Sequence, residues 1–130
     1  MNSKRNSKRK SKMWLILRHK KGELKILQDE FKKKLGNIPE IFCPKIKISK
    51  RIKNKTIELK HNFLLDYIFV YDKKFSCKNL IKNFQNLRGL KSLLPNGISY
   101  QEEIKKFINL FKLNSDNEGC IKQSYFDNLN

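Results

Sequence analysis

Residues 14–31 read WLILRHKKGELKILQDEF, and within them the pattern of apolar residues changes from that of a β-strand to that of an α-helix. Met13 to Leu17 form a short apolar run, bounded by the charged sequence HKKG at 19–22, which predicts a buried β-strand. From Glu23 onward the apolar residues recur at helical spacing and Gly36 follows as a C-terminal stop; the stripe consists of Leu24, Leu27, Phe31 and Leu35. The stretch therefore predicts a strand followed directly by an amphipathic helix.

Two further apolar patterns follow the irregular, proline-containing segment 37–44. In KIKISKRIKNKTIELKH at 45–61, apolar residues alternate with mostly basic ones on both sides of the turn-like Lys53-Asn54-Lys55. This pattern predicts a β-hairpin with one cationic face. FLLDYIFVY at 63–71 is almost continuously apolar, as expected of a central strand that is covered on both faces.

The C-terminal half adds two helices and a strand. Ser76 is placed to cap a helix that bears Leu80, Ile81 and Phe84. RGLKSLL at 88–94 predicts a strand and PNG at 95–97 a turn. Ser99 and Glu102 form a capping box before an apolar helical stripe, which consists of Ile104, Phe107, Ile108 and Phe111. This order of elements predicts an α+β fold, in which helices pack on an antiparallel β-sheet as a sandwich.

Length and charge limit the classes of protein further. A chain of 130 residues with 38% hydrophobic content supports one domain. Residues 1–12 hold six Lys or Arg, no acid and no apolar period, and we expect a disordered basic arm. Residues 13–130 still hold 24 basic and 12 acidic residues, a net charge of +12. Such an excess attracts polyanions, which favours DNA or RNA as a partner.

Several other classes are disfavoured. No stretch approaches the ~20 apolar residues of a membrane-spanning helix, so we expect no membrane partner and a cytoplasmic location. Cys43, Cys77 and Cys120 lack the short spacing that anchors a zinc site, so no metal is expected. Without a nucleophile motif or a Gly-rich phosphate loop, we expect no catalytic residues, no cofactor and no small-molecule substrate.

These patterns occur in an order that resembles a known family. The chain is similar to the N-terminal (NGN) domain of the NusG family of transcription elongation factors, including the RfaH-like members, over about residues 13–113. The resemblance rests on residues 14–31, the basic hairpin, NFLLDYIFV at 62–70, and RGLKSLLPNG at 88–97 with the capped helix after it. It implies a ferredoxin-like sandwich of the NGN type with a protruding basic β-hairpin.

The most specific matches are Trp14 at the start of its strand, the K-x-G-x-L-like entry to the first helix, Tyr67-x-Phe69-Val70 and Arg88-Gly89-Leu90. Two departures stand out. The family usually has Phe-Pro-Gly-Tyr or Phe-Pro-Asn-Tyr where this chain has Leu64-Leu65-Asp66-Tyr67, although Asp also favours turns. Arg18 replaces an aromatic residue that is frequent late in the first strand.

The segment after Leu113 differs from the family most. Residues 114–130 are rich in Asn and Asp, and we expect a loosely ordered tail. The sequence leaves open whether this tail folds over a binding cleft through Tyr125, Phe126 and Leu129. Family members continue through a linker into a small KOW β-barrel, and 17 residues are too few for one. The expectation is an NGN domain without a KOW domain.

The resemblance implies a polymerase-binding site. The family's domain offers an apolar depression to the clamp helices of the RNA polymerase β′ subunit and bridges to the β-side gate region. By position, the depression is lined or supported by Trp14, Tyr67, Phe69 and Leu93. The alternative is that these four are core residues, and Tyr67 is the strongest contact because its hydroxyl needs a polar partner. Residues facing the gate region would be Lys78, Asn79 and Lys82.

The resemblance also implies contacts with non-template and upstream DNA. Lys20, Lys21 and Arg88 match positions that touch the non-template strand in RfaH-like proteins, and their charges suit phosphates. On the hairpin, the residues directed towards upstream DNA would be Lys47, Lys50, Arg51, Lys53 and Lys55. Their alternative role is to keep an edge hairpin from aggregating.

Together these features predict a non-enzymatic, monomeric elongation or antitermination factor that binds RNA polymerase, bridges the DNA channel and suppresses pausing or termination. The alternative is a small basic RNA- or ribosome-binding module without polymerase contact. That alternative predicts tight binding of naked nucleic acid with a steep salt dependence.

Overall fold

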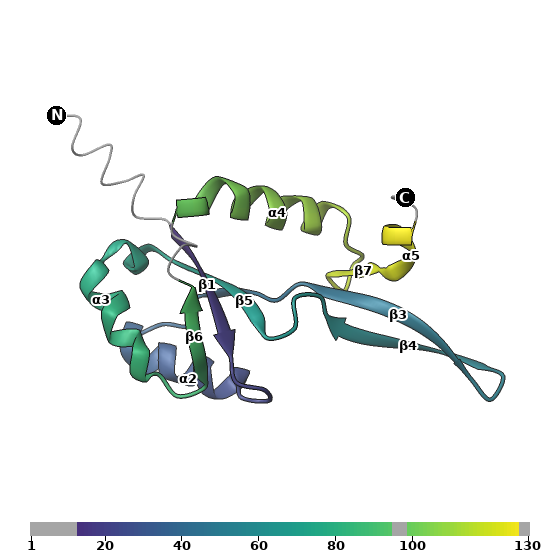
Figure 1. The fold of residues 1–130 in the computed structure, drawn as a ribbon, viewed down its shortest axis with the longest axis horizontal. Helices are drawn as coiled ribbons and strands as arrows, with labels where there is room; N and C mark the ends of the chain where they lie inside the picture. The colour runs from purple at the N-terminus through teal and green to yellow at the C-terminus, as the bar shows by residue number, and fades with distance from the viewer. Residues whose placement is uncertain (1–12, 95–98, 128–130) are drawn as a thin grey trace.

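A computed structural model describes residues 13–94 and 99–127 of the chain, in which four antiparallel strands form the central sheet (Figure 1). The strands are β1 (Met13–His19), β2 (Glu40–Phe42), β5 (Tyr67–Asp72) and β6 (Leu90–Leu94), in the order β2-β5-β1-β6. Each neighbouring pair is antiparallel. Helices α2 (Leu24–Leu35), α3 (Lys78–Lys82), α4 (Gln101–Leu113) and α5 (Gln123–Asp127) complete the fold with the strands, and the predicted α+β class is confirmed.

One face of this sheet is covered by α2 and by the chain around α3, which includes the 3₁₀ turns Lys73–Ser76 and Asn83–Asn86. Alternate residues of a strand point to opposite faces. Leu15 and Leu17 of β1 therefore point to the same side, where they meet Phe31 of α2 in a fully buried cluster. Phe31 packs against two further aromatic rings, Phe75 and Phe84.

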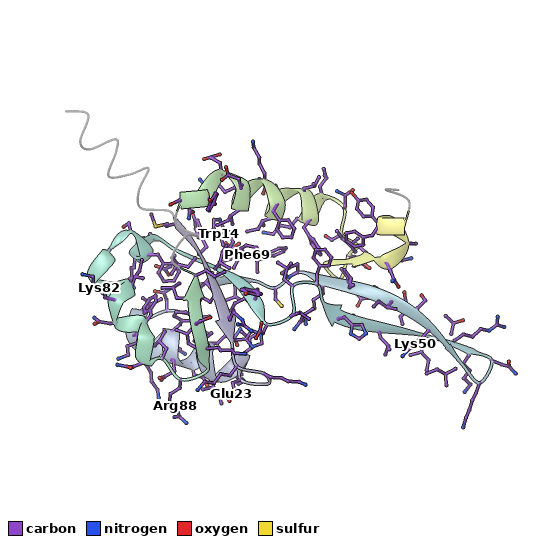
Figure 2. All side chains as sticks on the ribbon, viewed as in Figure 1. Trp14, Glu23, Lys50, Phe69, Lys82 and Arg88 are labelled. Atoms are coloured by element: carbon purple, nitrogen blue, oxygen red, sulfur yellow. The ribbon has the colours of Figure 1, made fainter. Side chains whose placement is uncertain are left out.

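The other face of the sheet lies beneath α4. Trp14 and Phe69 point to this side and pack with Ile104 and Ile108 of the helix, as Figure 2 shows for the two labelled aromatic residues. The first turn of α4 is attached to β1 through Gln101. Its side-chain Oε1 accepts from Trp14 N at 2.7 Å, and its Nε2 donates to Trp14 O at 2.8 Å. The side-chain amide thus takes the place of a strand partner for Trp14, since β6 pairs with β1 only from Ile16 onward.

A second sheet projects from the first. Strands β3 (Lys45–Ile52) and β4 (Lys55–Asn62) form an antiparallel hairpin that extends away from the domain (Figure 1). A third strand, β7 (Cys120–Lys122), pairs in parallel with β3, giving the order β4-β3-β7. The predicted loosely ordered tail is therefore wrong for residues 114–127, because this segment contributes a strand and a short helix to the root of the hairpin.

Several predicted boundaries also need correction. The central strand begins at Tyr67, since residues 63–66 form a turn. Ser76 caps no helix: its hydroxyl donates to Lys73 O, and α3 starts after Cys77 without a side-chain cap. The residue before α4 is Tyr100, so Ser99 is not at the capping position. The predicted basic arm 1–12 and the turn 95–97 lie outside the described residues.

The predicted first helix agrees closely with α2. Leu27, Phe31 and Leu35 are its buried residues, and Gly36 ends it in the left-handed conformation with φ 82°. Gly36 N donates to Lys32 O, which satisfies one of the carbonyls left free at the end of a helix.

Candidate docking groove and nucleic-acid interface

A groove of about 660 Å³ lies where the end of β1 meets the root of the hairpin. It is lined by Arg18, His19, Lys21, Gly22, His61, Asn62, Leu65, Asp66 and Lys91. A shift in strand register between Arg18 and His19 interrupts the β1–β6 pairing at this point. Such irregularities redirect side chains at the rim of a sheet.

Arg18 and Asp66 form an ion pair in the lining of the groove. The guanidinium donates from Nε to Oδ1 at 3.2 Å and from Nη2 to Oδ2 at 3.1 Å, a two-point contact. This contact holds the pKa of Asp66 below its ordinary value. The guanidinium also lies over the ring of Tyr67, 5.1 Å from its centroid. Arg18 is thus held in place as part of the groove.

The turn before β5 presents Leu65 to solvent. Leu65 has φ 61° and is 76% exposed. Most of this apolar residue therefore gains no hydrophobic free energy from folding. A left-handed conformation costs an L-residue about 1–2 kcal/mol. The turn is held by two backbone bonds, from His19 N to Asp66 O at 3.0 Å and from Tyr67 N to Leu64 O at 3.1 Å. The bend therefore forms without a proline, with the positive φ at Leu65.

His19 contributes a buried polar atom beside the groove. The side chain is 6% exposed, and Nδ1 lies 3.0 Å from the carbonyl oxygen of Lys20, which makes Nδ1 the donor. Its Nε2 is buried with no hydrogen-bond partner among the described residues.

The four residues predicted for the apolar depression do not lie together. Trp14 and Phe69 are each only 6% exposed and belong to the core beneath α4, so the alternative reading holds for both. Tyr67 lies half-buried beneath Arg18. Leu93 pairs with Leu17 and therefore points to the opposite face of the sheet, towards α2. The prediction for Leu93 is wrong by one residue, since Leu94 is the one that pairs with Ile16 on the α4 face.

The cations predicted to meet the non-template strand lie on two loops that touch. Lys20 N donates to Gly89 O at 2.8 Å, so the loop after β1 adjoins the loop before β6. Gly89 has φ 84°, and a Cβ there would lie 2.8 Å from Glu23 O, so glycine alone permits this approach to α2. Lys20, Lys21 and Arg88 are all exposed and have no ion-pair partner within the described part of the chain.

The predicted hairpin cations separate into two groups. Lys47 is only 8% exposed, and its Nζ lies 2.7 Å from Asp116 Oδ2 and 3.0 Å from Glu118 Oε1. These two carboxylates raise the pKa of Lys47, and Lys47 lowers that of Asp116 to about 2. Lys47 is therefore not available to phosphate in this arrangement, contrary to the prediction. The outer cations Lys50, Arg51, Lys53 and Lys55 are exposed, with no ion pair among residues 13–94 and 99–127.

The residues predicted to face the gate region lie far from the hairpin. Lys82 is exposed on α3, and Figure 2 shows Lys82 and Lys50 at opposite ends of the molecule. The side chains of Lys78 and Asn79 lie outside the described part of the chain.

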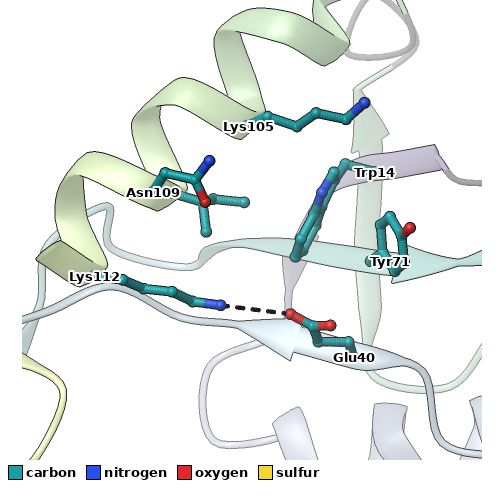
Figure 3. Close-up of a pocket in the computed structure, with 7 residues that line it drawn as sticks. Trp14, Glu40, Tyr71, Lys105, Asn109 and Lys112 are labelled. Atoms are coloured by element: carbon teal, nitrogen blue, oxygen red, sulfur yellow. Dashed lines mark ion pairs between the residues drawn. The ribbon is translucent and has the colours of Figure 1, made fainter.

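A second cavity, of about 360 Å³, opens between α4 and the β2 edge of the sheet (Figure 3). Trp14 and Tyr71 form its aromatic wall, with ring centroids 4.9 Å apart. Across the opening, Lys112 Nζ lies 3.7 Å from Glu40 Oε2. Burial, together with the charge of Glu40, raises the pKa of Tyr71.

Sequence reasoning missed Leu65, His61 and Lys91 as groove residues. Lys91 Nζ lies 3.8 Å from Asp66 Oδ2, and its side chain is 52% exposed. The alternation of side chains along β6 predicts that Lys91 points away from the face on which Leu90 is buried. The sequence does not show that Lys91 then lies beside the root of the hairpin.

Within the described residues, no three His, Cys, Asp or Glu side chains gather closely enough to hold a metal ion. In the same part of the chain, no helix is long and apolar enough to cross a membrane.

No protein-family model matches this chain, and no curated protein matches its sequence. The fold and the groove together define an α+β domain with a partly apolar, positively charged groove and a projecting hairpin.

Proposed function

We propose that this protein is a NusG-like transcription elongation or antitermination factor. The groove beside Leu65 binds the clamp helices of RNA polymerase, the α3 side faces the gate region, and the exposed cations contact non-template or upstream DNA. The protein acts in the cytoplasm as a monomer, without a cofactor and without catalysing a reaction.

The observation that carries this proposal is that Leu65 is exposed in a left-handed conformation at the groove. Its exposed apolar side chain and left-handed backbone are both unfavourable in the isolated protein. Strain of this kind persists where function selects it. A partner that covers Leu65 recovers the hydrophobic free energy that folding leaves unused. The Arg18–Asp66 pair and Tyr67 beside it offer hydrogen bonds and an aromatic surface, the residue types that dominate protein interfaces.

The charge distribution supports a partner that carries nucleic acid. Lys20, Lys21 and Arg88 adjoin one end of the sheet, and the outer hairpin cations lie on a separate projection. A protein that touches both sides of the polymerase cleft lowers the free energy of the closed clamp relative to the open one, because it binds the closed state better. Pausing and dissociation become less frequent as a result.

Retention by immobilised core RNA polymerase tests the proposal, with Leu65→Glu and Leu113→Glu as matched variants. Both leucines are mostly exposed, at 76% and 81%, so neither substitution removes core packing. Leu65→Glu should weaken retention at least about tenfold, which corresponds to about 1.4 kcal/mol. Leu113→Glu, at the last residue of α4 and outside the lining of the groove, should leave it unchanged. Tyr67→Ala should weaken retention as well, since it removes the aromatic support beneath Arg18.

Equal retention of both glutamate variants would show that the groove does not bind polymerase. If wild-type protein is not retained but binds RNA tightly with a steep salt dependence, the RNA- or ribosome-binding alternative holds instead.

A further inference from the structure

The polar face of the hairpin carries cations at its root as well as towards its outer end. Opposite residues of a β-ladder share a face, and the register pairs Lys47 with Lys60 and Arg51 with Thr56. We call the surface with these residues the cationic face; it consists of Lys45, Lys47, Ser49, Arg51, Thr56, Glu58, Lys60 and Asn62. Four of its residues are cations, and Glu58 is its single acid.

The inner half of the cationic face is occupied by an acidic turn, residues 116–119. Asp116 and Glu118 both pair with Lys47, and Glu118 also pairs with Lys60. Two backbone amides fix the turn, because Asp116 Oδ1 accepts from Glu118 N at 2.9 Å and from Cys120 N at 3.1 Å. The carboxylates of Asp116 and Glu118 thus lie over a cross-strand pair of lysines, the position that phosphates of a bound polyanion would take.

The shape of the hairpin indicates which polyanion fits. Its strands of eight residues span roughly 27 Å at ~3.4 Å per residue. The major groove of B-DNA admits a two-stranded β-ribbon, whereas the major groove of an RNA duplex is too narrow and deep for side chains to read. A duplex DNA segment can therefore lie along this face from the tip inward.

We propose that the hairpin root is a reserve binding surface for duplex DNA, in which the acidic turn occupies Lys47 and Lys60 until DNA phosphates displace it. This rests on the DNA contact of the proposed function. The turn is open to solvent, with Asn117, Glu118 and Gly119 all exposed. Its displacement exchanges carboxylates for phosphates on the same two ammonium groups, so both lysines keep a counter-charge.

The salt dependence of duplex DNA binding tests the proposal. Asp116→Asn with Glu118→Gln removes the competing charges, and Glu102→Gln with Glu103→Gln on exposed positions of α4 makes the same change in net charge elsewhere. Each additional phosphate contact steepens the slope of log K against log salt by about 0.9. In the α4 control, as in the wild-type protein, DNA must first displace the carboxylates, and salt weakens these ion pairs as well, which makes the slope shallower. The turn variant lacks this competition at two lysines, so its slope should be steeper than that of the α4 control by up to about 1.8.

A double-mutant cycle then assigns the gain to the two lysines. Lys47→Gln with Lys60→Gln should reduce the slope by about 1.8 more in the neutralised-turn background than in the wild-type protein. Circular dichroism checks that each variant is folded. In the wild-type protein, added duplex DNA at low salt should speed hydrogen exchange of the Glu118 and Cys120 amides, which the Asp116 carboxylate protects.

Equal slopes for the turn variant and the α4 control, or no coupling in the cycle, would overturn the proposal. The same coupling with an RNA duplex would overturn the assignment to DNA. The proposed function is tested separately. If Leu65→Glu does not weaken retention by polymerase, the groove is not the polymerase-binding site, and the result of the double-mutant cycle is unchanged.

Discussion

The root and the tip of the hairpin are built from the same two strands and the same alternation of isoleucine and lysine, yet they have opposite surroundings. At the root, Lys47 is 8% exposed and bonded to two carboxylates. At the tip, Lys53 and Lys55 are exposed and unpaired within the described part of the chain. The difference comes from residues 114–127, which are distant in sequence. Local charge pattern alone therefore does not show which lysines are free to bind.

The C-terminal segment encloses the root on more than one side. Its β7 pairs with the edge of β3, and the acidic turn covers the cationic face. Phe126 of α5 stacks on Phe63, with centroids 5.1 Å apart and planes 13° apart. On the side of the hairpin opposite the cationic face, two isoleucines of the tip are exposed, Ile52 at 47% and Ile57 at 41%.

The largest effect on this contrast is expected from two matched truncations, Ile121→Ala at the root and Ile57→Ala at the tip. Ile121 is 3% exposed, and removing a buried isoleucine costs about 2–5 kcal/mol through lost burial and the cavity that remains. Ile57 is 41% exposed, so its truncation should stay within about 0.5 kcal/mol. Urea unfolding measures both free energies.

Equal losses for the two variants would show that residues 114–127 do not stabilise the root. If Ile121→Ala releases only the C-terminal segment, the loss of free energy appears instead as faster hydrogen exchange at Cys120 and Ile121.

An intermediate effect is expected from pH. The pKa of Asp116 is about 2 in the folded protein, below the ordinary value of about 3.9, because Lys47 and two backbone amides bond to the charged form. A lowered pKa stabilises the fold above the unfolded value, and this stabilisation is lost as pH falls through the folded value. The stability difference between wild type and Asp116→Asn should therefore be constant above about pH 5 and shrink between about pH 4 and pH 2.

Urea titrations at several pH values measure this difference. In a Lys47→Gln background the decrease of this stability difference at low pH should become much smaller, since Lys47 is the main cause of the lowered pKa of Asp116. A difference that does not vary with pH in the wild-type background would mean that the ion pair adds no stability to the root.

The elements that sequence predicts well are those set by local periodicity. The helix from Leu24 to Leu35 and its end at Gly36 follow from apolar spacing and a left-handed glycine. The strand from Met13 and the strand from Leu90 follow from short apolar runs between polar segments. These signals lie within a few residues of each other, so no tertiary information is needed to interpret them.

The features that sequence missed depend on contacts between distant segments. Leu93 and Leu94 are both apolar, and only pairing with β1 decides which one faces α4. Lys47 resembles its neighbours in sequence, and only Asp116 and Glu118 separate it from them. Leu65 stands out because of its positive φ, and the sequence of the turn does not show which of its residues adopts that conformation.

The smallest effect is expected at the hairpin turn. Lys53 and Asn54 have φ values of 48° and 66°, the pattern of a type I′ turn, for which Asn-Gly is the preferred sequence. Lysine in a left-handed conformation costs about 1–2 kcal/mol. Lys53→Asn with Asn54→Gly should therefore stabilise the tip by roughly 1 kcal/mol. Slower hydrogen exchange of the Ile52 and Lys55 amides would report this change, with global urea unfolding nearly unchanged because the tip opens independently of the core. Lys53→Ala removes the same charge but keeps the unfavourable backbone, so it should give no such gain. If Lys53→Ala slows exchange equally, repulsion among the tip cations rather than backbone strain destabilises the tip, and its charge is the feature that distinguishes it from the root.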